Sequence, residues 1–214
     1  MKKTVIFDVD GTLLDTERIF MDAWREAGAR FGYTVTDEAL LKTRAVRMSE
    51  AIPVFQRCCG ADFPYMQVRE ERTRIAEAVI AGSVPETLRK PGVLQVLRTL
   101  RDRGHRLAVA SSTPQALTRA HLAHGGLLDF FPVVVTGDMV QNGKPAPDIF
   151  LLAAELSGTD PEDCAVVGDS PADVFGGHGA GMGVYLIPDQ VPANPETRAR
   201  SRRVLGSLME LLEV

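Results

Sequence analysis

The sequence predicts an α/β fold with a parallel sheet covered by helices on both faces, and a helical domain inserted after the first strand. Two observations predict the sheet: short β-branched runs recur along the chain, and helical patterns separate most of them. Continuous apolar runs that alternate with helices are typical of parallel strands buried on both faces. A third observation, a long helical stretch without a convincing strand, predicts the insertion.

The expected strands are the apolar runs, namely residues 4–8, 106–111, 133–136, 164–168 and 184–187. A short edge strand and a last helix are expected in the segment 202–214. The helices expected between the strands span residues 92–103, 114–124, 147–156 and 172–180. Since strands and helices alternate in this order, we predict a Rossmann-like core.

The segment after the first strand interrupts the alternation. Helical patterns lie near residues 18–31, 37–42, 49–59 and 65–81, and no strand pattern accompanies them. We therefore predict a discontinuous core domain, residues 1–15 and 86–214, with a four-helix cap domain at residues 16–85.

Composition excludes several classes of partner. The chain has 24 basic and 28 acidic residues and no basic block that would follow a phosphate backbone, so we expect no nucleic acid. No apolar run approaches the ~20 residues of a membrane span, and the N-terminal "MKKTVIFDVD" reaches an Asp too early for a secretory signal. We expect a cytoplasmic protein without a membrane partner, as a monomer or small homo-oligomer.

Polar side chains follow several of the predicted strands. The carboxyl ends of strands in an open parallel sheet are where ligands bind, so these residues are the candidates for a site. In chain order they are Asp8, Asp10, Ser111, Ser112, Thr113, Lys144, Asp169 and Asp173.

The two acidic residues after the first strand predict a metal ion. Asp8 and Asp10 are two positions apart, so continued strand geometry would place both carboxylates on one face, where they repel unless a cation intervenes. Asp169 would add an oxygen, and Mg²⁺ commonly takes carboxylates, water and a substrate phosphate. Lys144 would supply a positive charge and Ser111 a hydroxyl donor to phosphate oxygens. The pattern predicts Mg²⁺ and a small phosphorylated metabolite at this edge.

The order of these motifs resembles that of the haloacid dehalogenase superfamily. "DVDGT" resembles motif I, "LAVASS" motif II, "GKPAPDIF" motif III and "GDSPAD" motif IV. The helical insertion after motif I is similar to the cap of the subgroup that contains β-phosphoglucomutase, phosphoglycolate phosphatase and related sugar-phosphate phosphatases. The cap matches less specifically than the core.

The resemblance implies a role for each core residue. Asp8 would be the nucleophile that forms an aspartyl-phosphate, and Asp10 the general acid and base. Ser111 and Lys144 would hold the phosphoryl group. The implied Mg²⁺ ligands are Asp8, the backbone carbonyl of Asp10 and Asp169, with Asp173 orienting ligands and waters behind them.

Two alternatives to a Mg²⁺-dependent phosphatase of sugar phosphates or phosphoglycolate-like metabolites stay open. The first is a phosphosugar mutase: β-phosphoglucomutases present a His to the acid/base Asp in a motif resembling "AExHxxAW", whereas this chain has "ERIFMDAW", with Phe20 at that place. "GDSPAD", in place of the "EDSxxG" common in mutases, also favours a hydrolase. The second is a phosphate-binding module without turnover, which the presence of all four motifs disfavours.

Substrate specificity is expected to lie in the inserted helices, because a domain that closes over a site can contact the part of a substrate that does not react. Arg44 and Arg47 lie between two of these helices. One expectation is that one or both arginines contact an anionic or hydroxylated end of the substrate, together with Ser112 from the core. The alternative is that both arginines are ordinary surface charges.

Overall fold

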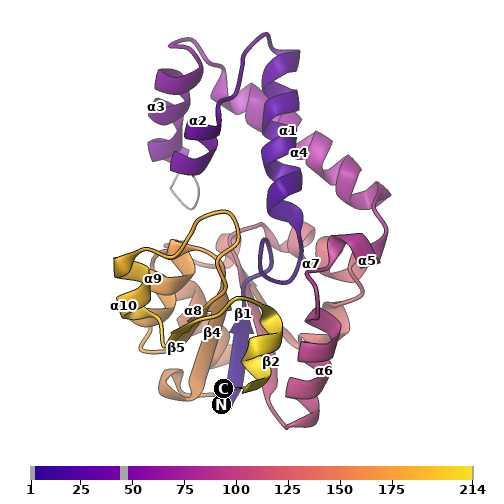
Figure 1. The fold of residues 1–214 in the computed structure, drawn as a ribbon, viewed down its shortest axis with the longest axis vertical. Coiled ribbons are helices and arrows are strands. Elements are labelled where there is room, and N and C mark those ends of the chain that lie inside the picture. Colours follow the sequence, from indigo (N-terminus) through magenta and orange to yellow (C-terminus); the bar gives the residue numbers. More distant parts are fainter. Residues whose placement is uncertain (1–2, 44–47, 214) are drawn as a thin grey trace. The chain divides into compact units, whose positions relative to one another are not determined.

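A computed structural model describes residues 3–43 and 48–213, which form two compact units (Figure 1). The core unit comprises the described residues up to Asp15 and from Pro85 onward, and the helical unit comprises Thr16–Val84. The helical unit therefore enters the chain after the first strand. Among the described residues, no helix combines the length and apolar composition needed to cross a membrane.

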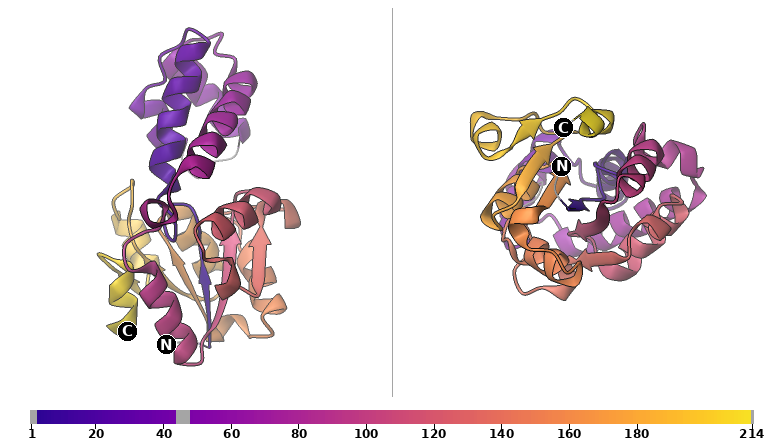
Figure 2. Two further views of the ribbon diagram at one scale, coloured as in Figure 1. Left: turned by 90° about the vertical axis from the view of Figure 1, so that its right-hand side faces the viewer. Right: turned by 90° about the horizontal axis from the view of Figure 1, so that it is seen from below.

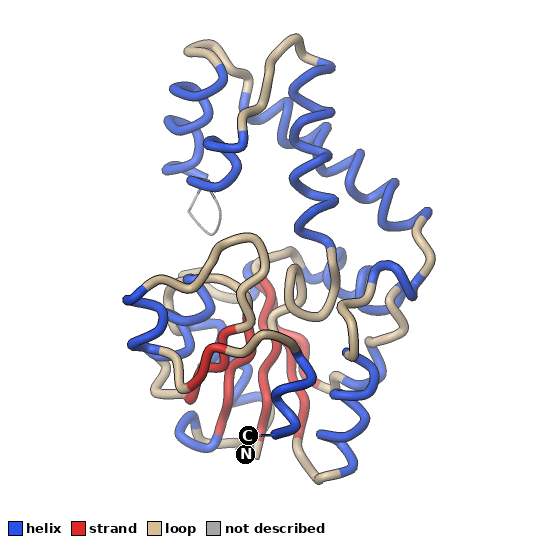
Figure 3. Tube along the Cα trace, viewed as in Figure 1, coloured by secondary structure: helices blue, strands red, loops and turns tan. Residues whose placement is uncertain are grey.

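Within the described residues, six strands form one sheet in which every neighbouring pair is parallel (Figure 3). The order across the sheet is β3-β2-β1-β4-β5-β6. The strands are β1 (Thr4–Phe7), β2 (Arg106–Ser111), β3 (Val133–Thr136), β4 (Cys164–Gly168), β5 (Gly183–Leu186) and β6 (Arg203–Val204). The predicted α/β fold is confirmed. The strand order reverses between β1 and β4, which is the place where open α/β sheets bind ligands.

The register brings the ends of β1 and β4 to the same level. Phe7 pairs with Val167, and the backbone N–H of Asp8 donates to the Val167 carbonyl at 2.9 Å, one step beyond the strand. Asp8 therefore lies level with Gly168, and Asp169 follows immediately. The sheet alone therefore places Asp8 and Asp169 side by side, although they are 161 positions apart in the sequence.

Helices cover both faces of the sheet (Figure 2). Ile6 and Val166 pack in one apolar cluster with Ile149, Phe150 and Val174 from the helices after β3 and β4. Neighbouring strand residues point to opposite faces. The helices of the core unit are α5 (Pro85–Leu88), α6 (Val93–Asp102), α7 (Gln115–His124), α8 (Asp148–Leu156), α9 (Pro171–Gly179) and α10 (Pro195–Arg200), with short 3₁₀ helices η1 (Leu128–Phe130), η2 (Gly137–Met139) and η3 (Pro161–Asp163).

The helical unit has an aromatic core. The ring of Trp24 lies 4.6 Å from that of Phe55 and 5.5 Å from that of Tyr65, between centroids. These rings join three helices, because each comes from a different one. The helices of this unit are α1 (Thr16–Arg30), α2 (Asp37–Lys42), α3 (Met48–Cys59) and α4 (Tyr65–Gly82), which agree with the predicted four to within two residues.

The prediction for the C-terminal segment is confirmed. A two-residue edge strand, β6, is followed by a helix, the 3₁₀ helix η4 (Leu208–Glu213). Leu208 and Leu211 are both buried, and residues three apart lie on the same side of a helix with three residues per turn. The helices expected from the sequence do not include α5 and α10, which have four and six residues.

Candidate active site

The loop after β1 turns sharply at Gly11, which has a φ of +88° that favours glycine. The loop is closed by two backbone hydrogen bonds: Gly11 donates to the carbonyl of Leu14 at 2.8 Å, and Leu14 donates to that of Val9 at 3.0 Å. A Cβ at Gly11 would lie 2.7 Å from a carboxylate oxygen of Asp169. The glycine therefore lets the loop after β1 approach the end of β4 closely.

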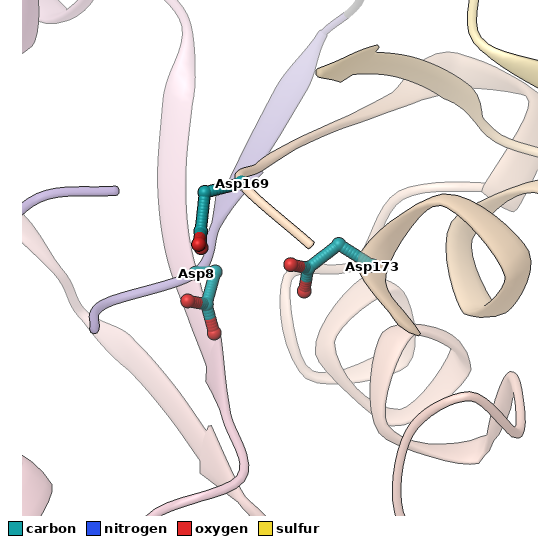
Figure 4. Close-up of side chains that lie close together, drawn as sticks. All are labelled: Asp8, Asp169 and Asp173. Carbon is teal, nitrogen blue, oxygen red and sulfur yellow. The ribbon is translucent and has the colours of Figure 1, made fainter. Parts of the chain in front are cut away.

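Three buried carboxylates lie together at this edge of the sheet (Figure 4). Asp8 follows β1, Asp169 follows β4, and Asp173 lies in the first turn of α9, and one carboxylate oxygen from each lies within 4.8 Å of the others. The three residues are 7 %, 3 % and 1 % exposed. Thr12 adds a hydrogen bond from its hydroxyl to Asp169 Oδ1 at 3.2 Å.

Asp173 is held in place by a capping box at the start of α9. Its backbone N–H donates to Ser170 Oγ at 3.3 Å, and its Oδ2 accepts from the Ser170 backbone N–H at 3.1 Å. The Ser170 hydroxyl also donates to Oδ2 at 2.6 Å. A Cβ at Gly168 would lie 2.4 Å from Asp173, so a side chain there would displace the carboxylate.

The ammonium of Lys144 has three acceptors. Nζ lies 2.6 Å from Asp8 Oδ1, 2.6 Å from Asp173 Oδ1 and 2.8 Å from the carbonyl of Ala110 in β2. The Lys144 side chain is 3 % exposed. One lysine from the segment after β3 therefore joins the ends of β1 and β2 to the start of α9.

Burial raises the pKa of Asp8 to about 8, although the Lys144 charge acts in the opposite direction. The charges of Asp173 and Asp10 raise it further. Burial alone would lower the pKa of Lys144, but the charges of Asp173 and Asp8 outweigh it and raise that pKa above its usual value. The Lys144 ammonium is therefore held as a cation.

The donor set fits a hard divalent cation. Three buried carboxylates face a single ammonium, so the described site carries an excess of negative charge that one divalent ion would offset. The available ligand atoms are oxygens, which Mg²⁺ and similar ions prefer. Both oxygens of Asp173 are engaged by Lys144 and Ser170, which leaves Asp8 and Asp169 better placed for direct contact with an ion.

A hydrogen bond from Thr113, one of the polar residues expected at this edge, joins Asp10 to the end of β2. The hydroxyl of Thr113 donates to Asp10 Oδ2 at 2.8 Å, and the backbone N–H of Thr113 donates to Oγ of the buried Ser111 at 3.1 Å. The "SST" run after β2 was a signal for hydroxyl groups at this edge, but it does not say which of them contacts an acidic residue.

The structure brings together Asp8, Asp10, Ser111, Lys144, Asp169 and Asp173 of the residues expected at the site. Ser112 is exposed, and within the described part of the chain it makes no hydrogen bond to these residues. Arg44 and Arg47 lie outside the described residues, so their expected contact with a substrate stays a prediction.

Comparisons with known proteins agree with this arrangement. The family model of haloacid dehalogenase-like hydrolases matches residues 2–181. Fructose-1-phosphate phosphatase YqaB of Escherichia coli is 33 % identical over 181 residues, which cover 83 % of this chain and 92 % of the relative. The phosphorylated carbohydrates phosphatase of Thermotoga maritima is 31 % identical over 184 residues, covering 84 % and 82 %.

A solved structure, CbbY from Rhodobacter sphaeroides in complex with xylulose-(1,5)bisphosphate, superposes with a TM-score of 0.81 at 29 % identity and covers 99 % of this chain and 96 % of its own. The match extends over both units of the chain. The chain therefore belongs to the haloacid dehalogenase-like hydrolase family, as an enzyme of the phosphatase type.

Proposed function

We propose that this protein hydrolyses small phosphorylated metabolites, sugar phosphates among them, in a Mg²⁺-dependent reaction through a phosphorylated Asp8. The observation that carries the proposal is the buried cluster of Asp8, Asp169 and Asp173, in which Asp8 and Asp173 contact the Lys144 ammonium. Two relatives are named as phosphatases of fructose 1-phosphate and of phosphorylated carbohydrates, which supports this substrate class.

In the first step, a carboxylate oxygen of Asp8 attacks phosphorus and the bond between phosphorus and the ester oxygen breaks. The departing alkoxide takes a proton from Asp10, and the alcohol leaves. The carboxylate acts as a nucleophile that divides one slow displacement into two easier ones. Proton donation by a positioned acid lowers the barrier for a poor leaving group.

In the second step, water attacks the phosphorus of the phosphorylated Asp8. The bond between phosphorus and the Asp8 oxygen breaks, so the carboxylate is restored and inorganic phosphate is released. Asp10, which lost its proton in the first step, accepts one from the attacking water. Each residue is then back in its starting state, and the net reaction is the hydrolysis of one ester.

Mg²⁺ would be held by Asp8, Asp169 and the backbone carbonyl of Asp10, and when bound it neutralises charge on the phosphoryl oxygens. Lys144 adds a fixed positive charge beside Asp8, and Asp173 keeps the ammonium in position. Ser111 supplies a hydroxyl at the same edge. Charges that are already oriented before the reaction are usually the largest contribution to catalysis.

The helical unit is proposed to act as a cap that sets substrate specificity, with Arg44, Arg47 and Ser112 as candidate contacts to the part of the substrate that does not react.

The alternative of a phosphosugar mutase is disfavoured by Phe20, which stands where β-phosphoglucomutases have a His. The guanidinium carbon of Arg72 lies 4.1 Å from the centroid of the Phe20 ring, which is 8 % exposed. A phenyl ring stacked in this way cannot relay a proton, as a His at that place would.

Release of inorganic phosphate tests the proposal. A panel of fructose 1-phosphate, glucose 6-phosphate, β-glucose 1-phosphate, phosphoglycolate and 4-nitrophenyl phosphate is assayed with Mg²⁺ and with a chelator. Asp8→Asn, which keeps the shape of the side chain, is the matched control. We expect Mg²⁺-dependent release from one or more esters and none from Asp8→Asn.

Two other outcomes would replace the proposal. Interconversion of β-glucose 1-phosphate and glucose 6-phosphate without net phosphate release would identify a mutase. Saturable binding of these esters without turnover of any of them would identify a binding module. Equal release by the wild type and by Asp8→Asn would refute the role of Asp8.

A further inference from the structure

We propose that Thr113 is a positioning residue that orients the carboxyl group of Asp10 for proton transfer, and that the buried Thr118 fixes Thr113 for this task. The proposal rests on the role of Asp10 in the proposed function. Thr113 lies outside the four motifs, and the family resemblance implies no role for it.

The contact joins two distant segments of the chain. Thr113 Oγ1 lies 2.8 Å from Asp10 Oδ2, and the residues are 103 positions apart. Both residues are partly buried, so water competes less with this hydrogen bond than at an open surface.

Hydrogen bonds to its N–H and to its carbonyl fix the backbone of Thr113, and this restricts the position of the Thr113 hydroxyl. The Thr113 N–H donates to Ser111 Oγ at 3.1 Å, and the Thr113 carbonyl accepts from Thr118 Oγ1 at 2.9 Å. Thr118 is fully buried, and its own backbone N–H donates to the Pro114 carbonyl at 2.9 Å. Side chains held by such supporting contacts keep a functional group within the narrow tolerance that catalysis needs.

A hydroxyl suits an acid that must lose and regain a proton. An O–H group can donate to a carboxylate and can also accept a hydrogen bond from a carboxylic acid. The contact between Thr113 and Asp10 therefore persists in both protonation states that the proposed cycle requires. A valine at position 113 would keep the shape of the side chain and remove this contact.

The test compares Thr113→Val with Thr113→Ser on aryl phosphates of similar shape and different leaving-group acidity, phenyl phosphate and 4-nitrophenyl phosphate. The value of kcat/KM reports the steps up to departure of the leaving group. Nitrophenolate departs without much help from an acid, whereas phenolate and alkoxides require it. We expect Thr113→Val to lower kcat/KM about 10-fold or more for phenyl phosphate and less than about 3-fold for 4-nitrophenyl phosphate.

Thr113→Ser restores the hydroxyl, so the ratio of the two kcat/KM values should return to that of the wild type. Thr118→Val, which leaves the Thr113 hydroxyl in place but removes its support, should change the ratio in the same direction by a smaller factor. An equal loss on both esters, an unchanged ratio, or failure of serine to restore it would overturn the proposal.

A second measurement follows the other half of the cycle. Acetyl phosphate transfers its phosphoryl group without help from an acid, so Thr113→Val should form the phosphorylated enzyme at the wild-type rate and lose phosphate about 10-fold more slowly. Equal rates of phosphate loss in the two proteins would count against the proposal.

The variant Asp10→Asn separates the acid/base role of Asp10 from the positioning role of Thr113. If Asp10→Asn leaves the ester ratio unchanged, the role of Asp10 itself fails. If it changes the ratio and Thr113→Val does not, only the positioning role fails.

Discussion

The Lys144 ammonium lies 2.6 Å from a carboxylate oxygen of Asp8, although the two residues are 136 positions apart in sequence. The same ammonium lies 2.6 Å from Asp173. Lys144 therefore offsets two of the buried carboxylates at once, and in the proposed mechanism it also supplies a positive charge beside the phosphoryl group.

Lys144→Met should destabilise the core and reduce turnover. Removing one partner of a buried ion pair leaves uncompensated charge, which costs about 3–5 kcal/mol. We expect a loss of about 3 kcal/mol in the free energy of urea unfolding, and a fall of about 100-fold or more in kcat because a fixed positive charge near the phosphoryl group is lost. Mg²⁺ should restore part of the stability and little of the activity. A variant as stable and active as the wild type would contradict this account.

The stability of the metal-free protein should fall with rising pH because of Asp8. The pKa of Asp8 is about 8 in the folded protein, above its ordinary value of 3.8, since burial opposes its ionisation. The folded state therefore binds the proton more tightly than the unfolded state, and this contribution is fully present below pH 3.8 and is lost as the pH rises to 8.

Urea unfolding in a chelator from pH 5 to pH 8 checks this expectation. The wild type should lose stability relative to Asp8→Asn over that range, because asparagine does not ionise. Added Mg²⁺ should stabilise the wild type more at pH 8 than at pH 5, since the ion binds the ionised carboxylate. Parallel pH curves for the two proteins would show that Asp8 ionises normally in the folded state.

Gly168→Ala should damage the site through Asp173. A Cβ at residue 168 would lie 2.4 Å from Asp173, and neither group can shift freely, because Asp173 is held by Ser170 and Lys144. We expect a loss of about 1–3 kcal/mol in stability together with a large loss of activity. Gly82→Ala is the matched control, since a Cβ there would meet nothing within 4 Å and alanine favours a helix by up to ~1 kcal/mol. Thermal unfolding of both variants measures the difference.

Lys90→Met should loosen the place where the chain leaves and re-enters the core unit. Lys90 Nζ lies 2.8 Å from Asp189 Oδ1 and 3.1 Å from Asp15 Oδ1, with 18 % of its side chain exposed. We expect a loss of about 1 kcal/mol, as for a partly exposed ion pair. Lys3→Met, which removes an exposed ion pair with Asp163, should have no measurable effect.

The effect of Lys90 should disappear at high pH. Burial lowers the pKa of Lys90, but the hydrogen bonds to Asp189 and Asp15 outweigh it and raise the pKa above the ordinary value of 10.5. The stabilising charge is then fully present below pH 10.5 and is lost as the pH rises through the folded pKa. The difference in unfolding free energy between wild type and Lys90→Met should be constant from pH 7 to pH 9.5 and shrink above 10.5. A difference that does not change with pH would show that packing, not charge, is responsible.

The positions of the site residues in the core unit could be predicted from the sequence, because these residues directly follow the ends of buried strands. Buried strands are visible in the sequence as apolar runs, and parallel strands have their carboxyl ends at one edge of the sheet, so the sequence predicts that Asp8 and Asp169 lie together. The contacts between Thr113 and Asp10, and between Lys90 and Asp189, could not be predicted. They depend on how loops turn, and a loop's path is not encoded in a hydrophobic period.

The central claim is that Asp8 is transiently phosphorylated, and the most direct measurement is to locate a trapped phosphoryl group. The protein is incubated with radiolabelled acetyl phosphate and Mg²⁺, quenched in acid and digested with pepsin at acid pH, where an aspartyl-phosphate persists. The account predicts label on a peptide that contains Asp8, persisting in Asp10→Asn and absent from Asp8→Asn. Label on another peptide, or label that survives in Asp8→Asn, would contradict it.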